Sequence, residues 1–203
     1  MILAGFFAGV LCLGLVIGDW LYFIRRTPDA SRYGCGVART QDRFTDTTIP
    51  ELAARFDADG LLTLPHGTAR FFPGLNQIVI RQKYRVFAAG FRTLWPLKGL
   101  LFLSPDGDEI SVLYRKLTPW SSALLTGIWF ALVVVGTVGA LIGLLLEGEL
   151  SSPGGVVLAF GILGLGAVFL LSGTITVVFA YRLETARLTT VYQELREALE
   201  GRA

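Results

Sequence analysis

The sequence predicts an α+β integral membrane protein. The predicted chain has three transmembrane helices. A small antiparallel β domain is inserted between helices 1 and 2, and a C-terminal cytoplasmic amphipathic helix follows helix 3. Three observations predict it. The 203 residues are 53% hydrophobic and 17% charged, whereas an average soluble domain is about 25% charged. Three uncharged runs, residues 1–18, 117–146 and 150–181, each reach the roughly 18 residues of a transmembrane candidate. Short strand-like segments separated by turn residues lie between the first and second runs.

The same composition excludes several classes of protein. A chain this apolar is neither an ordinary soluble enzyme nor a disordered protein. Its net charge of +2 gives no signature of nucleic-acid binding. Of the two cysteines, Cys12 lies inside the first apolar run and Cys35 follows that run. A disulfide between them is therefore not expected, and a disulfide-built secreted domain is excluded.

The apolar runs set the boundaries of the predicted spans. Residues 1–24 are expected to form the first transmembrane helix, about 36 Å long at 1.5 Å per residue, with Trp20 and Tyr22 near the membrane interface. No Lys or Arg precedes this run, so it is interpreted as an anchor and not as a signal peptide. The other segments are a second helix at 120–146, a short outer loop at 147–155 and a third helix at 156–181.

The orientation follows from the basic residues near the helix ends. Residues 25–119 hold 14 Lys and Arg, and the tail from Arg182 holds 4 Arg. The loop between the second and third runs holds two Glu and no basic residue. The positive-inside rule then places the N-terminus outside and the C-terminus in the cytoplasm, and the composition suggests a bacterial inner membrane.

The segment between the first and second helices is expected to hold a soluble domain. Residues 25–47 are polar and are expected to form a linker. Residues 48–119 are expected to form a small cytoplasmic α+β domain. Its first element is predicted to be a short helix, which begins with a capping box of Thr48 and Glu51 and ends at Gly60.

Strand signals fill the rest of this domain. A hairpin turn at residues 105–108 joins the last two strands. The predicted strands are 61–64, 69–72, 77–87, 99–104 and 109–116.

The strand at 77–87 carries a basic comb. Arg81, Lys83 and Arg85 alternate with Gln82 and Tyr84, so the three cations share one face of the strand. One interpretation is a solvated outer face that also protects an edge strand. The other is contact with anionic lipid headgroups or with a protein partner, at about 1 kcal/mol per basic residue near an anionic surface.

The predicted helices present small residues that suit close helix packing. Glycines spaced four apart let two helix backbones approach each other. Helices of the same chain or of another subunit could fill these faces. The candidate helix-packing residues are Gly5, Gly9, Gly14, Gly18, Gly139 and Gly143.

The C-terminal segment, residues 182–203, has an apolar stripe at helical spacing. Its members are Leu188, Tyr192, Leu195 and Leu199, while Arg196 and Glu200 form an i,i+4 pair beside it. This partner stripe needs a cover, which either the β domain or another protein could provide.

Catalysis has few candidate residues. His66 is the single histidine, and Cys35 is the single cysteine outside the apolar runs; the two form at most a formal nucleophile pair. Asp19, the one carboxylate inside a span, is expected to reach the interface or to pair with Arg25 or Arg26. We therefore expect no catalytic residue, no metal site and no cofactor, and no small-molecule substrate is indicated.

Two functional hypotheses follow. In the first, the chain is a non-catalytic accessory or structural subunit of a larger bacterial inner-membrane complex, photosynthetic or respiratory, and binds other membrane subunits through its glycine faces and β domain. In the second, it is a membrane-anchored sensor or adaptor whose β domain binds anionic lipid or a regulatory protein. A transporter part and a membrane enzyme are further alternatives, and Asp19, Cys35 and His66 are the enzyme's only candidates.

Overall fold

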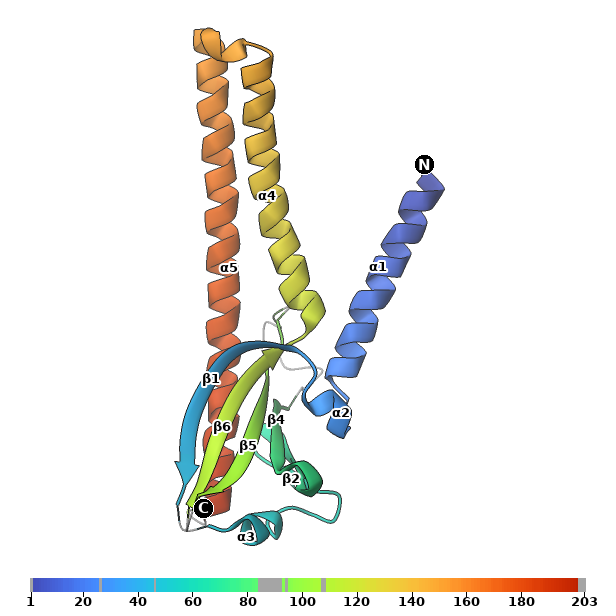
Figure 1. Cartoon of the computed structure of the whole chain (residues 1–203), viewed down its shortest axis with the longest axis vertical. Helices are drawn as coiled ribbons and strands as arrows, with labels where there is room; N and C mark the ends of the chain where they lie inside the picture. Colours follow the sequence, from blue (N-terminus) through green and yellow to red (C-terminus); the bar gives the residue numbers. More distant parts are fainter. Residues whose placement is uncertain are drawn as a thin grey trace. The chain divides into compact units, whose positions relative to one another are not determined.

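The computed structural model describes residues 2–25, 27–45, 47–83, 93, 95–106 and 109–200 (Figure 1). The chain divides into two compact units. One comprises Met1–Ser122 with Arg182–Ala203, and the other is Ala123–Tyr181. The first unit contains a six-stranded antiparallel sheet with strand order β1-β6-β5-β4-β3-β2, so the predicted mixture of helices and an antiparallel sheet is confirmed. The strands are β1 (Cys35–Phe44), β2 (Leu61–Thr63), β3 (Gly67–Phe72), β4 (Gln77–Gln82), β5 (Lys98–Asp106) and β6 (Glu109–Thr118).

The predicted linker at 25–47 is wrong, because these residues form regular structure. Helix α2 (Pro28–Ser31) is followed by β1, a ten-residue edge strand paired with β6. Most side chains of β1 are exposed or half-buried, so its sequence lacks the apolar alternation by which a strand is recognised. Its partner, β6, lies more than 60 residues later in the chain, and only the tertiary fold reveals the pairing.

The helix predicted to run from Thr48 to Gly60 is shorter than expected. Helix α3 covers Ile49–Ala53 only, and the capping box is present, with the Thr48 N–H donating to the Glu51 carboxylate at 2.9 Å. Gly60 lies instead in the following turn, at a φ of +69°. A Cβ there would stand 2.6 Å from the Phe71 carbonyl oxygen, so this turn requires glycine. The Gly60 signal therefore marks a turn and not a helix end.

Strand β4 is a central strand, so the interpretation of its basic comb as an edge-strand feature is wrong. It pairs with β3 on one side and β5 on the other. Ile78 and Ile80 are fully buried on one face and Val79 is nearly buried on the other. The part of the predicted strand after Lys83 lies outside the described residues.

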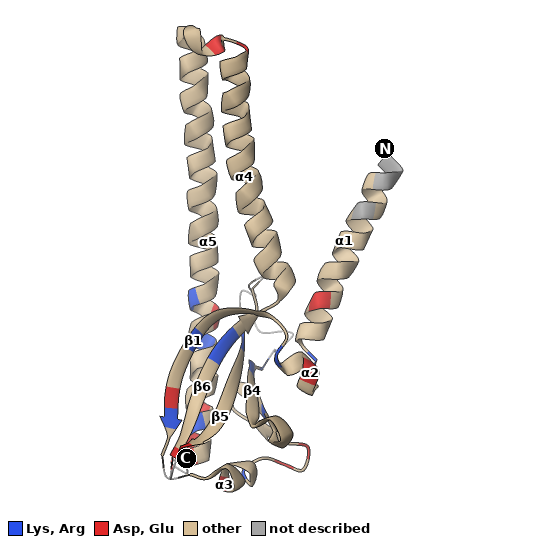
Figure 2. Cartoon of the chain, viewed as in Figure 1, with Lys and Arg blue, Asp and Glu red and all other residues tan. Residues whose placement is uncertain are grey.

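Three helices of the described chain are long and apolar enough to cross a membrane. They are α1 (Ile2–Phe23), α4 (Trp120–Leu146) and α5 (Pro153–Glu200). A short 3-10 turn, η2 (Glu149–Ser151), precedes α5. Figure 2 shows that α4 and the adjacent length of α5 are free of charged residues, and that acidic residues mark the turn joining them.

The second unit is the α4–α5 hairpin (Figure 1). Gly166 of α5 packs against Thr137 of α4, and Gly173 packs against Trp129, so closely that an added Cβ would overlap the neighbour. Glycine thus sets the approach of the two helices. Thr137 satisfies its hydroxyl within its own helix by donating to the Val133 carbonyl at 2.8 Å.

Both faces of the sheet are covered in the first unit. The C-terminal part of α5 covers one face: Leu188, Val191 and Leu195 are fully buried, and a Cβ on Gly67 of β3 would overlap Val191. The end of α1 and α2 cover part of the other face. The cluster there consists of Phe23, Phe72, Val79, Leu100 and Leu117, with Tyr33 and Phe102 at its margin.

Replacing Leu195 with Ala is expected to destabilise the sheet domain by about 2–5 kcal/mol, because the side chain is fully buried and its loss leaves a cavity. Thermal unfolding of the detergent-solubilised chain measures the effect. Leu75→Ala is the matched control, since Leu75 is 37% exposed and should change stability little. Equal stability of the two variants would contradict the packing of α5 on the sheet.

Candidate functional site: the arginine face of the sheet

The face of the sheet opposite α5 is rich in arginine. Side chains alternate along each strand, and the strand register therefore assigns each residue to a face. The acids on this face, Asp106 and Glu109, lie at the β5–β6 hairpin end. We call it the arginine face, defined by Arg39, Arg43, Arg70, Arg81, Lys98 and Arg115.

Arg81 holds the end of α1. Its guanidinium donates to the carbonyl oxygens of Phe23 and Arg25, both at 2.8 Å, and also to that of Ile24. The last carbonyls of a helix have no partner within the helix and carry partial negative charge. The side chain from β4 therefore caps α1 and fixes its end to the sheet.

Lys98, the first residue of β5, is fully buried beside this cap. Its Nζ donates to the Ala30 carbonyl at 2.6 Å and lies 4.3 Å from the centroid of the Phe23 ring. Burial lowers the pKa of Lys98 to about 7, and the nearby charge of Arg81 adds to this effect. Two neighbouring cations thus hold the backbone of the α1–α2 corner.

Asp19 joins three segments. Its carboxylate accepts hydrogen bonds from the Ser121 N–H at 3.0 Å, from the Ser121 hydroxyl at 2.6 Å and from the Tyr33 hydroxyl. The bond to Ser121 caps the N-terminus of α4, where a carboxylate is favoured. The bond to Asp19 raises the pKa of Tyr33 to about 12. Of the two arginines expected as partners of Asp19, Arg25 forms no ion pair with it among the described residues, and Arg26 lies outside them.

The exposed part of the arginine face contains a like-charge pair. Arg39 and Arg115 are directly opposite each other on β1 and β6, a placement that is destabilising between strands unless something neutralises it. Arg115 lies 5.2 Å above the Phe102 ring. Among the described residues, no carboxylate forms an ion pair with either arginine, whereas Arg43 pairs with Glu109 at 3.4 Å.

The basic comb is only partly placed by the structure. Arg81 is half-buried against α1, Lys83 is exposed, and Arg85 lies outside the described residues. Sequence reasoning missed Arg39, Arg70 and Arg115 because they lie on strands far apart in the chain.

The predicted glycine faces have no neighbour in their own units. A Cβ added at any of them would meet no atom within 4 Å. The glycines of the hairpin contact are instead Gly166 and Gly173 of α5. The six open positions are Gly5, Gly9, Gly14, Gly18, Gly139 and Gly143.

The partner stripe is covered by the sheet of the same chain. Leu188, Leu195 and Leu199 are buried, and the Tyr192 ring stacks on Tyr114 with centroids 5.0 Å apart. Of the two covers expected for the stripe, the structure shows the β domain of the same chain.

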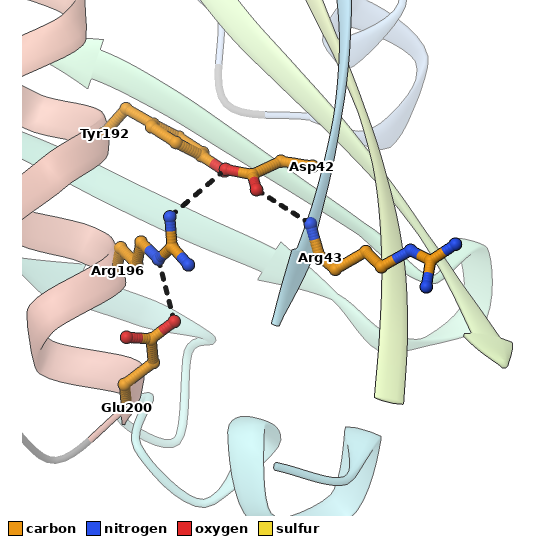
Figure 3. A network of polar contacts seen from close by, with 5 residues as sticks. All are labelled: Asp42, Arg43, Tyr192, Arg196 and Glu200. Atoms are coloured by element: carbon orange, nitrogen blue, oxygen red, sulfur yellow. Dashed lines mark hydrogen bonds and ion pairs between the residues drawn. The ribbon is translucent and has the colours of Figure 1, made fainter. Parts of the chain in front are cut away.

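Polar contacts fix the register of this packing (Figure 3). The Tyr192 hydroxyl donates to the Asp42 carboxylate at 2.6 Å, and Arg196 lies 3.6 Å from the same oxygen. Arg196 also donates to Glu200 at 2.7 Å, which places the predicted i,i+4 pair. The network ties the last turns of α5 to the edge strand β1.

The two candidates for nucleophilic chemistry lie at opposite edges of the sheet. Cys35 begins β1, and His66 precedes β3 next to β2 at the other edge. The His66 N–H donates to Glu194 at 3.0 Å, and its ring contacts the same carboxylate. Within the described ranges, no group of three His, Cys, Asp or Glu residues could hold a metal ion.

Comparisons with known proteins found no significant similarity to this chain. No family model matches it, and neither a curated protein nor a solved structure is significantly similar. The functional argument therefore rests on its own residues.

Replacing Lys98 with Met is expected to flatten the pH dependence of the stability of the sheet domain. The folded-state pKa of about 7 lies below the unfolded value of about 10.4, so the unfolded chain binds more protons between these values. Wild-type stability should therefore rise with pH from about 7 to about 10, and this group contributes no slope below that window. Thermal unfolding across the window measures the slope.

Lys83→Met, at an exposed position directly after β4, is the control and should keep the wild-type slope. Lys116, whose pKa is also lowered by burial, leaves a smaller slope in the Lys98→Met variant. An unchanged slope in Lys98→Met would refute the assignment.

Proposed function

We propose that this chain is a membrane-anchored binding module, not an enzyme, whose sheet domain lies on the cytoplasmic surface of a bacterial inner membrane. Its arginine face contacts anionic lipid headgroups there. The observation that carries the proposal is the position of this face: Arg81 donates to the carbonyls at the end of α1, and Lys98 donates to Ala30 of α2 and lies over the Phe23 ring. The basic surface therefore begins where a membrane-length apolar helix ends.

Electrostatics favour this placement. A basic residue near an anionic membrane surface contributes about 1 kcal/mol, and the attraction fades over a Debye length of about 8 Å. Because the domain is tethered by α1, it stays within that range without a separate docking energy. The facing pair of Arg39 and Arg115 gains most from an anionic surface, which removes the repulsion between the two guanidinium groups.

The charge distribution supports the cytoplasmic orientation. Arg25 lies two residues after the end of α1, and Arg182 and Arg187 follow the apolar length of α5. Glu147 and Glu149 lie at the α4–α5 turn. Basic residues collect on the cytoplasmic side of membrane proteins, where the anionic lipids of the inner leaflet are.

A binding role also agrees with the chemistry of the described residues. Cys35 and His66 lie on different edges of the sheet. Asp19 is engaged by Tyr33 and Ser121. Cys35 and His66 are thus too far apart to act as a nucleophile pair, and the Asp19 carboxylate is used to join segments of the fold. Both findings favour a module that binds.

The Arg39→Gln/Arg115→Gln variant is expected to lose contact between the sheet and anionic lipid. In nanodiscs that contain phosphatidylglycerol, amide hydrogen exchange of β1 and β6 should be slower than in phosphatidylcholine nanodiscs, and added salt should reduce the difference. The double variant should show a smaller difference, because two of the exposed cations of this face are gone.

Arg55→Gln removes a positive charge at an exposed position outside this face and should behave as wild type. Equal exchange in both lipids for the wild-type chain would contradict the proposed function.

A second function, an accessory subunit of a larger inner-membrane complex, is favoured by one observation. Gly139 and Gly143 of α4 are open in the α4–α5 unit, although Gly166 and Gly173 of α5 are used for packing. A small-residue face that the hairpin itself does not fill can receive a helix of another membrane subunit.

Gly139→Leu/Gly143→Leu is expected to abolish co-purification of partner subunits in mild detergent, since leucine blocks close helix approach. Gly127→Leu, also on an open position of α4, is the control. A wild-type chain that purifies alone, with the native mass of a monomer, would refute the accessory role.

A further inference from the structure

The edge strand β1 contains an extra residue, Val37, near its start. Gly36 is opposite Leu117 and Ala38 is opposite Lys116, so the register shifts by one and Val37 has no partner on β6. A β-bulge of this kind re-aims a side chain away from the regular pleat. Val37 is 41% exposed, and within the described strands it is the only exposed Val, Leu, Ile, Phe or Tyr.

The bulge lies at the end of the sheet from which two membrane-length helices leave. A Cβ added at Gly34 would stand 2.9 Å from the ring of Phe23, the last residue of α1, and 2.8 Å from the Thr118 carbonyl oxygen. Helix α4 begins at Trp120, two residues after that carbonyl. Three strand residues span about 10 Å, so Val37 lies close to the level at which both helices begin to be apolar.

The surroundings of Val37 are basic. Arg39 follows it by two residues and is exposed, and Arg115 lies opposite Arg39 on β6. Residues 35–41 and 110–118, which form this part of the β1–β6 ladder, include no Asp or Glu. An exposed apolar side chain among cations is the combination with which proteins enter the interface of an anionic membrane.

We propose that Val37 is a shallow membrane anchor, whose side chain enters the interface between headgroups and acyl chains of the bilayer that α1 spans. Arg39 and Arg115 then contact the phosphates around it. The inference rests on the proposed function and deepens it, because it names the part of the sheet that reaches into the lipid. The sheet domain thereby gains a second point of attachment besides α1.

A single side chain is sufficient for this role because the domain is already tethered. Helix α1 keeps the sheet at the bilayer surface, so the anchor acts at a high effective concentration of lipid and selects only an orientation. In that orientation the exposed part of Val37 leaves water, which is favourable for an apolar group. The edge of β1 then faces the membrane.

Fluorescence of an NBD group at residue 37 tests the anchor in the full chain. The label is attached to Val37→Cys in a Cys12→Ser/Cys35→Ser background, and the chain is placed in nanodiscs of phosphatidylglycerol or of phosphatidylcholine. In phosphatidylglycerol we expect a blue-shifted emission that is quenched by lipid with a doxyl group near its headgroup. Leu75→Cys is the matched control, since Leu75 is 37% exposed in the turn between β3 and β4, and its label should emit as in water.

Val37→Asn gives a second measurement without a label. For each variant, the amide exchange rate of residues 38–40 in phosphatidylcholine is divided by the rate in phosphatidylglycerol, so that changes in intrinsic exchange cancel. This ratio should fall roughly threefold or more in Val37→Asn, because the exposed part of the valine no longer gains from leaving water. Leu75→Asn should keep the wild-type ratio.

The outcomes separate the anchor from the proposed function. A label at residue 37 that stays in water, while wild-type β1 and β6 exchange more slowly in phosphatidylglycerol, would overturn the anchor and leave the proposed function standing. A blue-shifted label that doxyl lipid does not quench would mean that protein covers Val37, which also overturns the anchor. Equal exchange of β1 and β6 in the two lipids contradicts the proposed function itself.

Discussion

The carbonyl groups at the end of α1 impose the constraint on which the sheet domain depends. A helix that ends in a soluble domain leaves its last carbonyls without partners, and a buried end of this kind must be satisfied by other groups. In this chain Arg81 and Lys98, neighbours on β4 and β5, donate to the α1–α2 corner. The same contacts bring Phe23 into the apolar cluster on that face of the sheet.

The side chains that donate to this corner of the backbone are cations, so positive charge collects on this face of the sheet. Burial and the nearby charge of Arg81 disfavour the charged form of Lys98 and lower its pKa. The structural need for donors at a helix end therefore places cations on the same face that we propose to contact anionic lipid.

The other face of the sheet follows a different rule. Apolar residues of β3 to β6 need a cover, and α5 provides it by extending from an apolar span into an amphipathic helix. Tyr192, Asp42 and Arg196 then set the register between helix and sheet. With α5 on one side, the surface left for an outside partner is the arginine face, together with the open glycines of the helices.

Local sequence was sufficient for elements whose signal lies within one segment. The three apolar helices follow from uncharged length, and the alternation of Ile78 and Ile80 with Arg81 correctly separated the two faces of β4. The capping box at Thr48 and Glu51 marked the start of α3. These signals are set by backbone geometry and side-chain periodicity, which act over a few residues.

The tertiary structure alone decided the features that join distant segments. Strand β1 exists because β6 pairs with it, and Asp19 acts as a cap because Ser121 lies within reach. The cations of the arginine face come from β1, β3, β4, β5 and β6. The sequence by itself determined that the chain has membrane-length helices and a small sheet. Which cations share a face, and which polar groups meet, depends on long-range pairing and burial, for which no single segment carries a signal.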